Sequence, residues 1–450
     1  MKRWMIRVIA LVLCLSIIQP TIGQAEETLD LNGRVTGEIS DSQKQQLYKV
    51  VVPKRGLLFF DLKSWIDLVD YRVMDEDGKE FVDYTLHSDA LTPKTKTLFY
   101  DLEAGIYYFE VNQWSKGHNG KFELKTSFTS YDTNDQEPNN GTEEAQVLAF
   151  GKKLKGYISY QDENDVYRVT LPKAGLLKVD VSSLIYGNAE VYVRDSSNRE
   201  IRNEIIKSDG RTPAKYSTSV NLEAGTYYVE VEGWDPPDTT GLYDIMASFT
   251  PVNNQEKEPN NGTTQAMPLS FYKPLTGFLS WNDTEDFYKI SLPKSSTVTL
   301  DLQSMVDSNS VLELYDRNFK VVHEEQISSS SRTPKKYSKS LKLSAGTYYV
   351  AVKAWDETRD TGKYVLQVKS SHLLPPLSVN AISSRSTTIT GKTEKYANMT
   401  FKIGKKTYKR KADAKGNYVF KMKKQRAGSV IQVTSKNKYG TTTKRVTVKR

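Results

Sequence analysis

A repeated acidic segment limits how this 450-residue chain can fold. Residues 135–140 read DQEPNN, and residues 256–261 read EKEPNN. Each segment is followed by a glycine-led stretch, a tyrosine-containing stretch that ends in Pro-Lys, a Thr-Pro turn and a stretch that closes on tryptophan. A period of about 120 residues is too long for one unit of a solenoid and is typical of a complete small domain.

These marks occur three times, although the first copy has no EPNN segment. We therefore expect three tandem domains, of which the first is divergent, at residues 26–131, 132–251 and 252–373. After two consecutive prolines at 375 and 376, short strand-like stretches alternate with glycine turns. Residues 374–450 are therefore expected to form a fourth, smaller domain.

Apolar and polar residues alternate with a period of two in the tyrosine stretches. Tyr167, Val169 and Leu171 fall on one face, and Arg168 and Thr170 fall on the other. Turn-forming residues lie between these stretches, and no long period of 3.6 residues is present. The sequence predicts an all-β chain, with three tandem jelly-roll β-sandwiches and a small C-terminal Ig-like β-sandwich.

The acidic segments offer oxygen ligands at regular spacing. Residues two apart in an extended chain project to the same side, and Pro138 and Pro259 disfavour helix at the glutamate before them. Calcium takes six to eight oxygen ligands from carboxylates, amides and backbone. We expect one calcium site in the second domain and one in the third, formed by Asp135, Glu137, Asn139, Asn140, Asp162 and Asp165, and by Glu256, Glu258, Asn260, Asn261, Asp283 and Asp286.

A simpler interpretation is a solvated acidic linker in which Asn-Asn-Gly forms a turn. The first domain provides a comparison within the chain. Gln43 and Gln46 stand there at the positions of the aspartate pair. Because amides do not supply the charge of carboxylates, we expect no calcium in the first domain.

The EPNN segment, the aspartate pair and the AGTYYVEV stretch together resemble the bacterial pre-peptidase C-terminal domain, whose relatives include the collagen-binding domains of clostridial collagenases. The resemblance extends over residues 28–370 as three copies. It implies a jelly-roll sandwich, often with calcium bound near its N-terminal linker at the acidic positions named above. It also implies a usual place behind a secreted protease domain, which is not evident before these repeats. Residues 374–450 resemble bacterial Ig-like modules of secreted Gram-positive proteins.

The first 25 residues have the features of an export signal. Basic residues at 2, 3 and 7 are followed by an apolar run, and small residues at 23 and 25 precede a plausible cut before Glu26. Cys14, the only cysteine, follows Leu13, which is too large for a lipid-attachment signal. No LPxTG-type sorting sequence lies near Arg450. We expect a secreted protein without disulfides, with cell-wall association as a further possibility.

Charge is distributed unevenly along the chain. Residues 376–450 hold 20 basic and two acidic residues, a net charge of +18, whereas residues 26–375 hold 40 basic and 52 acidic residues, a net charge of −12. A strongly positive field attracts polyanions and weakens as salt is added. We expect the tail to bind an anionic wall polymer such as teichoic acid, with nucleic acid disfavoured, through Lys405, Lys406, Lys409, Arg410, Lys411, Lys421, Lys423, Lys424 and Arg426.

Aromatic residues recur near the end of each repeat. Alternation places Tyr227 inside the sandwich and Tyr228 outside, and the equivalents of Tyr228 are Tyr108 and Tyr349. Outward tyrosines can bind a polymer or protein ligand, or they can simply cover cross-strand neighbours. The repeated tryptophans are expected to cap the ends of the sandwiches: Trp114, Trp234 and Trp355.

Residue types that support catalysis are sparse. The four histidines are scattered, and neither a GxSxG elbow nor a glycine-rich phosphate loop is present. The paired carboxylates fit calcium better than the acid and base of a glycosidase. We expect a non-catalytic, secreted adhesion protein or, as the alternative, an accessory or regulatory partner of a separately encoded secreted protease.

Overall fold

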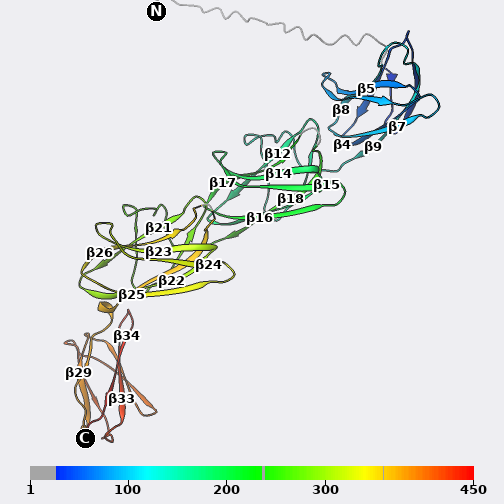
Figure 1. Cartoon of the computed structure of the whole chain (residues 1–450). Helices are drawn as coiled ribbons and strands as arrows, with labels where there is room; N and C mark the ends of the chain where they lie inside the picture. The colour runs from blue at the N-terminus through cyan, green and yellow to red at the C-terminus, as the bar shows by residue number, and fades with distance from the viewer. Residues whose placement is uncertain (1–26, 236–238, 358) are drawn as a thin grey trace, which may run out of the picture. The chain divides into compact units, whose positions relative to one another are not determined.

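The computed structural model describes residues 27–235, 239–357 and 359–450, so the predicted export signal lies outside the described residues. Strands build all four domains (Figure 1). The helical element in this part of the chain is one short 3-10 turn, η1 (Ser371–Leu373). The all-β prediction is confirmed. Within the described ranges, no helix is long and apolar enough to cross a membrane.

The first domain is a sandwich of two sheets. The five-stranded sheet has the order β1 (Glu27–Thr28), β3 (Gln45–Val52), β8 (Gly105–Gln113), β5 (Leu68–Asp75) and β6 (Glu80–His87). The four-stranded sheet has the order β2 (Arg34–Ile39), β9 (Gly120–Ser130), β4 (Gly56–Ser64) and β7 (Lys94–Leu102). Because successive side chains point to opposite faces, each strand turns alternate residues inward. Leu58, Phe60 and Leu62 of β4 are buried in this way.

The second domain repeats this strand order. Its five-stranded sheet has the order β10 (Gln146–Val147), β12 (Asn164–Leu171), β17 (Gly225–Gly233), β14 (Tyr186–Asp195) and β15 (Glu200–Asp209). Its four-stranded sheet has the order β11 (Lys153–Ile158), β18 (Gly241–Pro251), β13 (Gly175–Ser183) and β16 (Ala214–Leu222). Tyr227, Val229 and Val231 of β17 are buried, as their alternation predicts.

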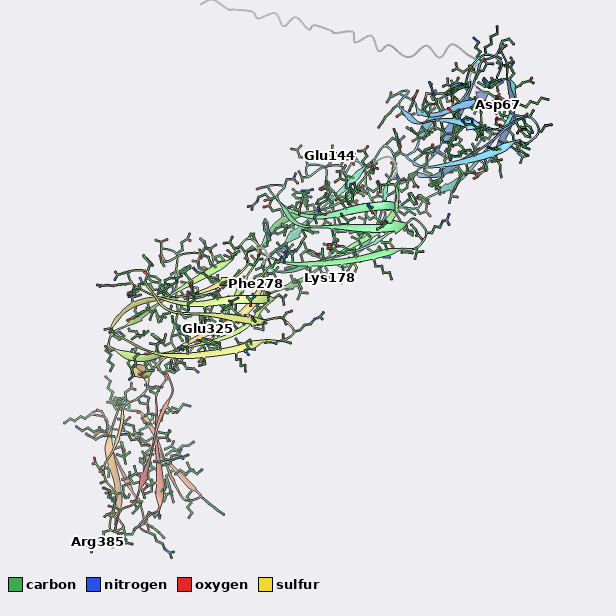
Figure 2. The ribbon with its side chains drawn as sticks, viewed as in Figure 1. Asp67, Glu144, Lys178, Phe278, Glu325 and Arg385 are labelled. Carbon is green, nitrogen blue, oxygen red and sulfur yellow. The ribbon has the colours of Figure 1, made fainter. Side chains whose placement is uncertain are left out.

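The third domain has the same topology again. Its sheets have the orders β19 (Met267–Pro268), β21 (Glu285–Leu292), β26 (Gly346–Ala354), β23 (Ser308–Asp316) and β24 (Val321–Ser329), and β20 (Leu275–Leu279), β27 (Gly362–Ser370), β22 (Ser296–Val306) and β25 (Lys335–Leu343). Phe278 of β20 is buried, and Glu325 lies on the edge strand β24 (Figure 2). The repeat in the sequence therefore corresponds to one complete sandwich.

The tail is a smaller sandwich. Its sheets have the orders β28 (Leu377–Val379), β29 (Thr388–Thr393) and β32 (Asn417–Lys421), and β31 (Lys406–Lys411), β30 (Asn398–Ile403), β33 (Val430–Lys436) and β34 (Thr441–Thr447). Phe401 stacks on Phe420 in its core, with ring centroids 4.6 Å apart. Basic side chains such as Arg385 lie on its surface (Figure 2).

The chain divides into two compact units. One unit holds the first domain and most of the second. The other holds residues 170–178 and 218–225 of the second domain together with residues 248–450. Each cluster of functional side chains described below lies within a single unit.

Candidate functional site

The linker before the second sandwich is extended and hydrogen-bonded to that sandwich. The amide of Asp135 donates to the carbonyl oxygen of Lys155 at 3.3 Å. The amide of Val166 donates to the carbonyl oxygen of Asn139 at 2.7 Å. Asn139 is completely buried by this docking. The linker is thus fixed by backbone contacts, and its side chains are held against the start of β12.

This docking brings linker carboxylates to the carboxylates that precede and begin β12. Oxygens of Asp135, Glu137 and Asp165 all lie within 4.8 Å of one another. Asp162 belongs to a tight turn in which the amide of Ser159 donates to its carbonyl oxygen at 2.9 Å. Asp162 and Asp165 are both buried. We call Asp135, Glu137, Asn139, Asp162 and Asp165 the second-domain cluster.

The third domain forms an equivalent cluster from its own linker. Oxygens of Glu256, Glu258 and Asp286 lie within 4.8 Å of one another. Asp283 lies in the matching turn, where its carbonyl oxygen accepts a hydrogen bond of 2.8 Å from the amide of Ser280. Asn260 is completely buried. The third-domain cluster comprises Glu256, Glu258, Asn260, Asp283 and Asp286.

The two remaining asparagines of the predicted sites lie at the rims of the clusters. Asn140 and Asn261 are both exposed. The side-chain nitrogen of Asn140 donates to Asp162 Oδ1 at 2.8 Å. The side-chain oxygen of Asn261 accepts a hydrogen bond of 3.1 Å from the amide of Asn260. Both side chains therefore make hydrogen bonds within their clusters.

A pair of tyrosines lies beneath each cluster, and sequence reasoning missed one member of each pair. Tyr243 donates to Asp165 Oδ2, and its hydroxyl lies 2.5 Å from that of Tyr167. Tyr364 donates to Asp286 Oδ2 at 2.6 Å and lies 2.5 Å from Tyr288. A comparison of the repeats could have found these residues, because the domain that lacks the aspartates has Phe122 at this position.

Several buried oxygens of the clusters have no hydrogen-bond donor in the described part of the chain. A buried polar atom without a partner costs free energy, so such atoms are usually satisfied. These oxygens gather where the carboxylates converge, and oxygen is the ligand type that calcium prefers. They are Asp135 Oδ1, Asp162 Oδ2, Asp165 Oδ1, Glu258 Oε1, Asn260 Oδ1, Asp283 Oδ1, Asp283 Oδ2 and Asp286 Oδ1.

Crowding and burial make the carboxylates of both clusters difficult to ionise together. Burial, followed by the charges of Glu137 and Glu103, raises the pKa of Asp162 to about 7. Burial, followed by Glu258 and Glu223, raises the pKa of Asp283 to about 8. The concentrated negative charge is what a bound cation would offset.

Each cluster also receives side chains from the preceding domain, which the sequence analysis did not predict. Arg55 Nη1 of the first domain donates to Asp135 Oδ2 at 2.7 Å, and Arg55 Nε donates to Glu103 Oε2 at 3.2 Å. Burial, followed by the charge of Glu258 in the next domain, raises the pKa of Glu223 of the second domain to about 7. The clusters therefore lie where consecutive domains meet within a unit.

The first domain replaces the cluster with neutral groups. Gln46 stands at the position of Asp165, and its Oε1 accepts a hydrogen bond of 2.6 Å from Tyr48. Its side-chain nitrogen donates to the carbonyl oxygen of Glu38 at 2.9 Å. Gln43, Gln46, Tyr48 and Phe122 line a cleft of about 1140 Å³. Both ends of the Gln46 amide are satisfied without a charge.

The candidate ligand-facing tyrosines are half-buried and contact their own sheets. Tyr108, Tyr228 and Tyr349 pair across the strands with Met74, Arg194 and Tyr315, respectively. The ring of Tyr349 also lies 5.7 Å from that of Phe319. These contacts favour the covering role that was one of the two predicted alternatives.

The tryptophans that close the repeats are more accessible than these tyrosines. The prediction that they cap the sandwiches is wrong, because a capping ring would be largely covered. Their exposed fractions are similar in all three domains, at 52% for Trp114, 53% for Trp234 and 60% for Trp355. Each domain therefore presents one large aromatic ring at the same place in its fold.

Every predicted polyanion-binding residue of the tail is exposed: Lys405, Lys406, Lys409, Arg410, Lys411, Lys421, Lys423, Lys424 and Arg426. Five of them lie on or beside the edge strand β31. The two acidic residues of the tail are engaged elsewhere. Asp413 accepts hydrogen bonds from the amides of its own turn, and Glu394 Oε2 accepts one of 2.6 Å from Asn437. The positive charge of β31 is thus not offset by these acids.

The histidines do not assemble a catalytic group among the described residues. His118 lies 3.5 Å from Asp67, a surface residue of the first domain (Figure 2). His323 stacks on Tyr337 and His372 lies 2.7 Å from Ser370, while His87 is an exposed residue of β6. In the described ranges, the groups able to hold a metal are the two carboxylate clusters.

Comparison with protein families agrees with this architecture. Residues 163–233 match the family model of the bacterial pre-peptidase C-terminal domain. Residues 375–450 match that of a bacterial Ig domain. The chain contains both kinds of domain. Because the first and third sandwiches share the topology of the second, the pre-peptidase C-terminal fold occurs in three tandem copies.

Similar proteins include a collagenase. Collagenase ColA of Clostridium perfringens is 26% identical over 254 residues, which cover 53% of this chain and 22% of ColA. The chain thus spans about a fifth of the length of this relative. The pre-peptidase C-terminal domain of a Bacillus anthracis collagenase is 13% identical, covers 23% of this chain and 96% of its own, and has a TM-score of 0.20. Tandem CBM51 modules of a Streptococcus pneumoniae family 98 glycoside hydrolase are 8% identical, cover 48% and 84%, and have a TM-score of 0.17.

Proposed function

We propose that this protein is an exported, non-catalytic adhesion protein that binds an anionic cell-wall polymer through its tail and presents calcium-stabilised sandwiches to a second ligand. The observation that carries the proposal is the basic surface of β31. Its lysines and arginine are exposed, and the two acidic residues of the tail are hydrogen-bonded elsewhere. An anionic polymer such as teichoic acid supplies the missing counter-charge.

Calcium has a structural role in this proposal. Asp135, Glu137 and Asp165 would hold it in the second domain, and Glu256, Glu258 and Asp286 would hold it in the third. The buried oxygens without donors support this assignment, since a cation satisfies several of them at once. Bound calcium offsets the repulsion among the carboxylates and fixes each linker to its sandwich.

The second ligand is a polymer or protein that contacts the three sandwiches. Similarity to ColA supports a fibrous protein such as collagen, and the exposed tryptophans supply contact surface at three equivalent places. The test replaces Trp114, Trp234 and Trp355 with alanine and measures pelleting with collagen fibrils. We expect at least about a tenfold loss of affinity, equivalent to about 1.4 kcal/mol.

The wall role is tested by co-sedimentation of the mature protein with purified cell wall, with and without teichoic acid, across a salt series. The variant replaces four basic residues of β31 with glutamine: Lys406, Lys409, Arg410 and Lys411. A matched control replaces four lysines on β25, an edge strand of the third domain: Lys335, Lys336, Lys339 and Lys342. We expect salt-sensitive pelleting that requires teichoic acid and is lost only in the β31 variant.

Pelleting that is equally weakened by both sets of substitutions would show a general charge effect and would contradict the assignment to β31. Absence of pelleting with any wall preparation would contradict the wall role itself. It would favour the alternative of an accessory to a separately encoded secreted protease. That alternative predicts that a secreted protease co-purifies with the full chain.

A further inference from the structure

A glutamate in the loop before the AG-Tyr-Tyr strand occurs in the first and second domains but not in the third. The loop before β8 contains Glu103, and the equivalent loop before β17 contains Glu223. In the third domain the same position is Ser344. The first and second domains are each followed by a carboxylate cluster, whereas the third is followed by the Ig domain. The acid is therefore present only where the next domain carries a cluster.

Glu103 and Glu223 hold equivalent places beside the two clusters. Glu103 Oε2 accepts a hydrogen bond of 3.2 Å from Arg55 Nε, and the same guanidinium donates to Asp135 of the next domain through Nη1 at 2.7 Å. The backbone amide of Glu223 donates a hydrogen bond of 3.2 Å to Asn282 Oδ1, in the turn that holds Asp283. These contacts fix the loop of the preceding domain against the linker or the turn of the next.

The two junctions differ in one charged residue. In the first junction, the guanidinium of Arg55 contacts Asp135 at 2.7 Å, Glu103 at 3.2 Å and Glu137 at 3.5 Å. The equivalent residue in the second junction is Ala174. The backbone contact at this residue is unchanged, because Tyr131 donates its amide to the carbonyl of Arg55 and Val252 donates to that of Ala174, both at 3.0 Å. Only the side chain, and with it a positive charge, is missing.

We propose that Glu223 completes the metal site of the third domain as a ligand from the preceding domain, and that Arg55 compensates the second-domain cluster so that it binds calcium more weakly. This inference rests on the calcium role proposed above. Under this proposal, the metal ion of the third-domain site connects the second sandwich to the third through Glu223. The second-domain cluster is held to the first domain by the arginine.

The charges of the two clusters support this ranking. The third-domain cluster and Glu223 together contain five carboxylates, without a cationic side chain at position 174. The second-domain cluster and Glu103 also contain five carboxylates, but Arg55 contacts three of them. A neighbouring cation lowers the attraction for a divalent ion and occupies Asp135 Oδ2 as a hydrogen-bond donor. We expect the two sites to differ in calcium affinity by at least about tenfold, which corresponds to about 1.4 kcal/mol.

The experiment titrates the mature chain with calcium chloride by isothermal titration calorimetry. Asp165→Asn removes a ligand of the second-domain cluster, and Asp286→Asn removes the equivalent ligand of the third. The protein that retains the third-domain site should bind calcium at least about tenfold more tightly than the protein that retains the second. In the Asp286→Asn background, Arg55→Met should tighten binding, whereas Arg55→Lys, which keeps the charge, should not.

Glu223 is tested in the Asp165→Asn background. Glu223→Gln should weaken calcium binding at least about tenfold, because a charged ligand is replaced by a neutral one. Two exposed residues serve as charge-matched controls and should leave affinity unchanged: Arg34→Met and Glu204→Gln. Circular dichroism checks that each variant is folded, and Glu223→Gln tests the proposal independently if Arg55→Met does not fold.

The outcomes separate this inference from the calcium role on which it rests. Two sites of equal affinity, or an affinity that does not respond to Glu223→Gln, would overturn the inference and leave the calcium role intact. No heat of binding from the unsubstituted protein would overturn the calcium role itself.

Discussion

In the first domain Gln46 occupies the position at which the third domain has Asp286. The amide of Gln46 accepts a hydrogen bond from Tyr48 and donates one to the carbonyl of Glu38. Asp286 accepts a hydrogen bond of 2.6 Å from Tyr364 through one oxygen, and its other oxygen has no donor in the described part of the chain. The same strand topology therefore holds a neutral amide at this position in the first domain and a carboxyl group in the third.

The difference between these domains involves several positions that change together. Where the aspartates are replaced by glutamines, the tyrosine that would donate to the carboxylate is replaced by Phe122. The acidic linker segment is absent as well. The fold itself therefore does not require the carboxylates. Their presence in two domains supports the calcium role proposed above, because burying unpaired carboxylates opposes folding.

Calcium removal should produce the largest difference between the first and third domains. A ligand present at about 100 times its dissociation constant stabilises a folded domain by about 2.7 kcal/mol. For a domain of this size, that corresponds to a change in Tm of about 10 °C. Calorimetry of the mature chain in calcium and in chelator should show the transition of the third domain shift by this amount and that of the second domain shift by less, while the transition of the first domain does not move.

The transition of the third domain is assigned with Asp286→Asn. In calcium this variant should unfold near the temperature of the chelated protein, and chelation should change it little further at that transition. The prediction fails if chelation lowers all transitions equally, since that would indicate a general effect of calcium on the chain.

The converse substitution, Gln46→Asp, should place a carboxylate in the first domain without the other carboxylates that would hold a metal ion beside it. A half-buried carboxylate would replace the neutral amide, and the first domain has no EPNN segment to complete a metal site. We expect a loss of about 2 kcal/mol in the free energy of unfolding of the first domain. The measurement is denaturant unfolding with and without calcium, with Gln46→Asn as the neutral control. Rescue by calcium would contradict the requirement for the linker.

The sequence predicted the sandwiches because alternation and turn residues are local signals, and Tyr227, Val229 and Val231 are buried as expected. It also predicted which acidic residues converge, because the spacing within an extended linker fixes their common side. It did not predict Arg55 or Glu223, since these residues approach the clusters from a preceding domain. Nor did it predict the exposure of Trp234, because periodicity cannot show what lies over a strand end.

Tyr364→Phe gives the third domain the residue that the first domain has at the equivalent position, Phe122. It removes the donor to Asp286 Oδ2 and leaves that oxygen unsatisfied. The cost should be about 1–1.5 kcal/mol in calcium, in the range of a single intramolecular hydrogen bond. The same measurement on Tyr348→Phe is the control, because Tyr348 donates to the carbonyl of Ser344 and not to the cluster. Equal losses in the two variants would show that the cluster gives Tyr364 no special role.

The smallest predicted effect is a dependence on pH in the absence of metal. Burial and neighbouring carboxylates raise the pKa of Asp283 to about 8, so the folded third domain binds protons that the unfolded chain releases above about pH 4. Stability should therefore be greatest at low pH and fall as pH rises from about 4 towards 8. Even one unit of net pKa shift corresponds to about 1.4 kcal/mol.

Thermal unfolding in chelator across this pH range should show the decline in stability in the third domain and not in the first, where Gln43 and Gln46 do not titrate. With calcium present the decline should diminish, because the ion binds the deprotonated carboxylates and stabilises the form that is otherwise penalised. A decline of equal size in both domains would assign it to other groups.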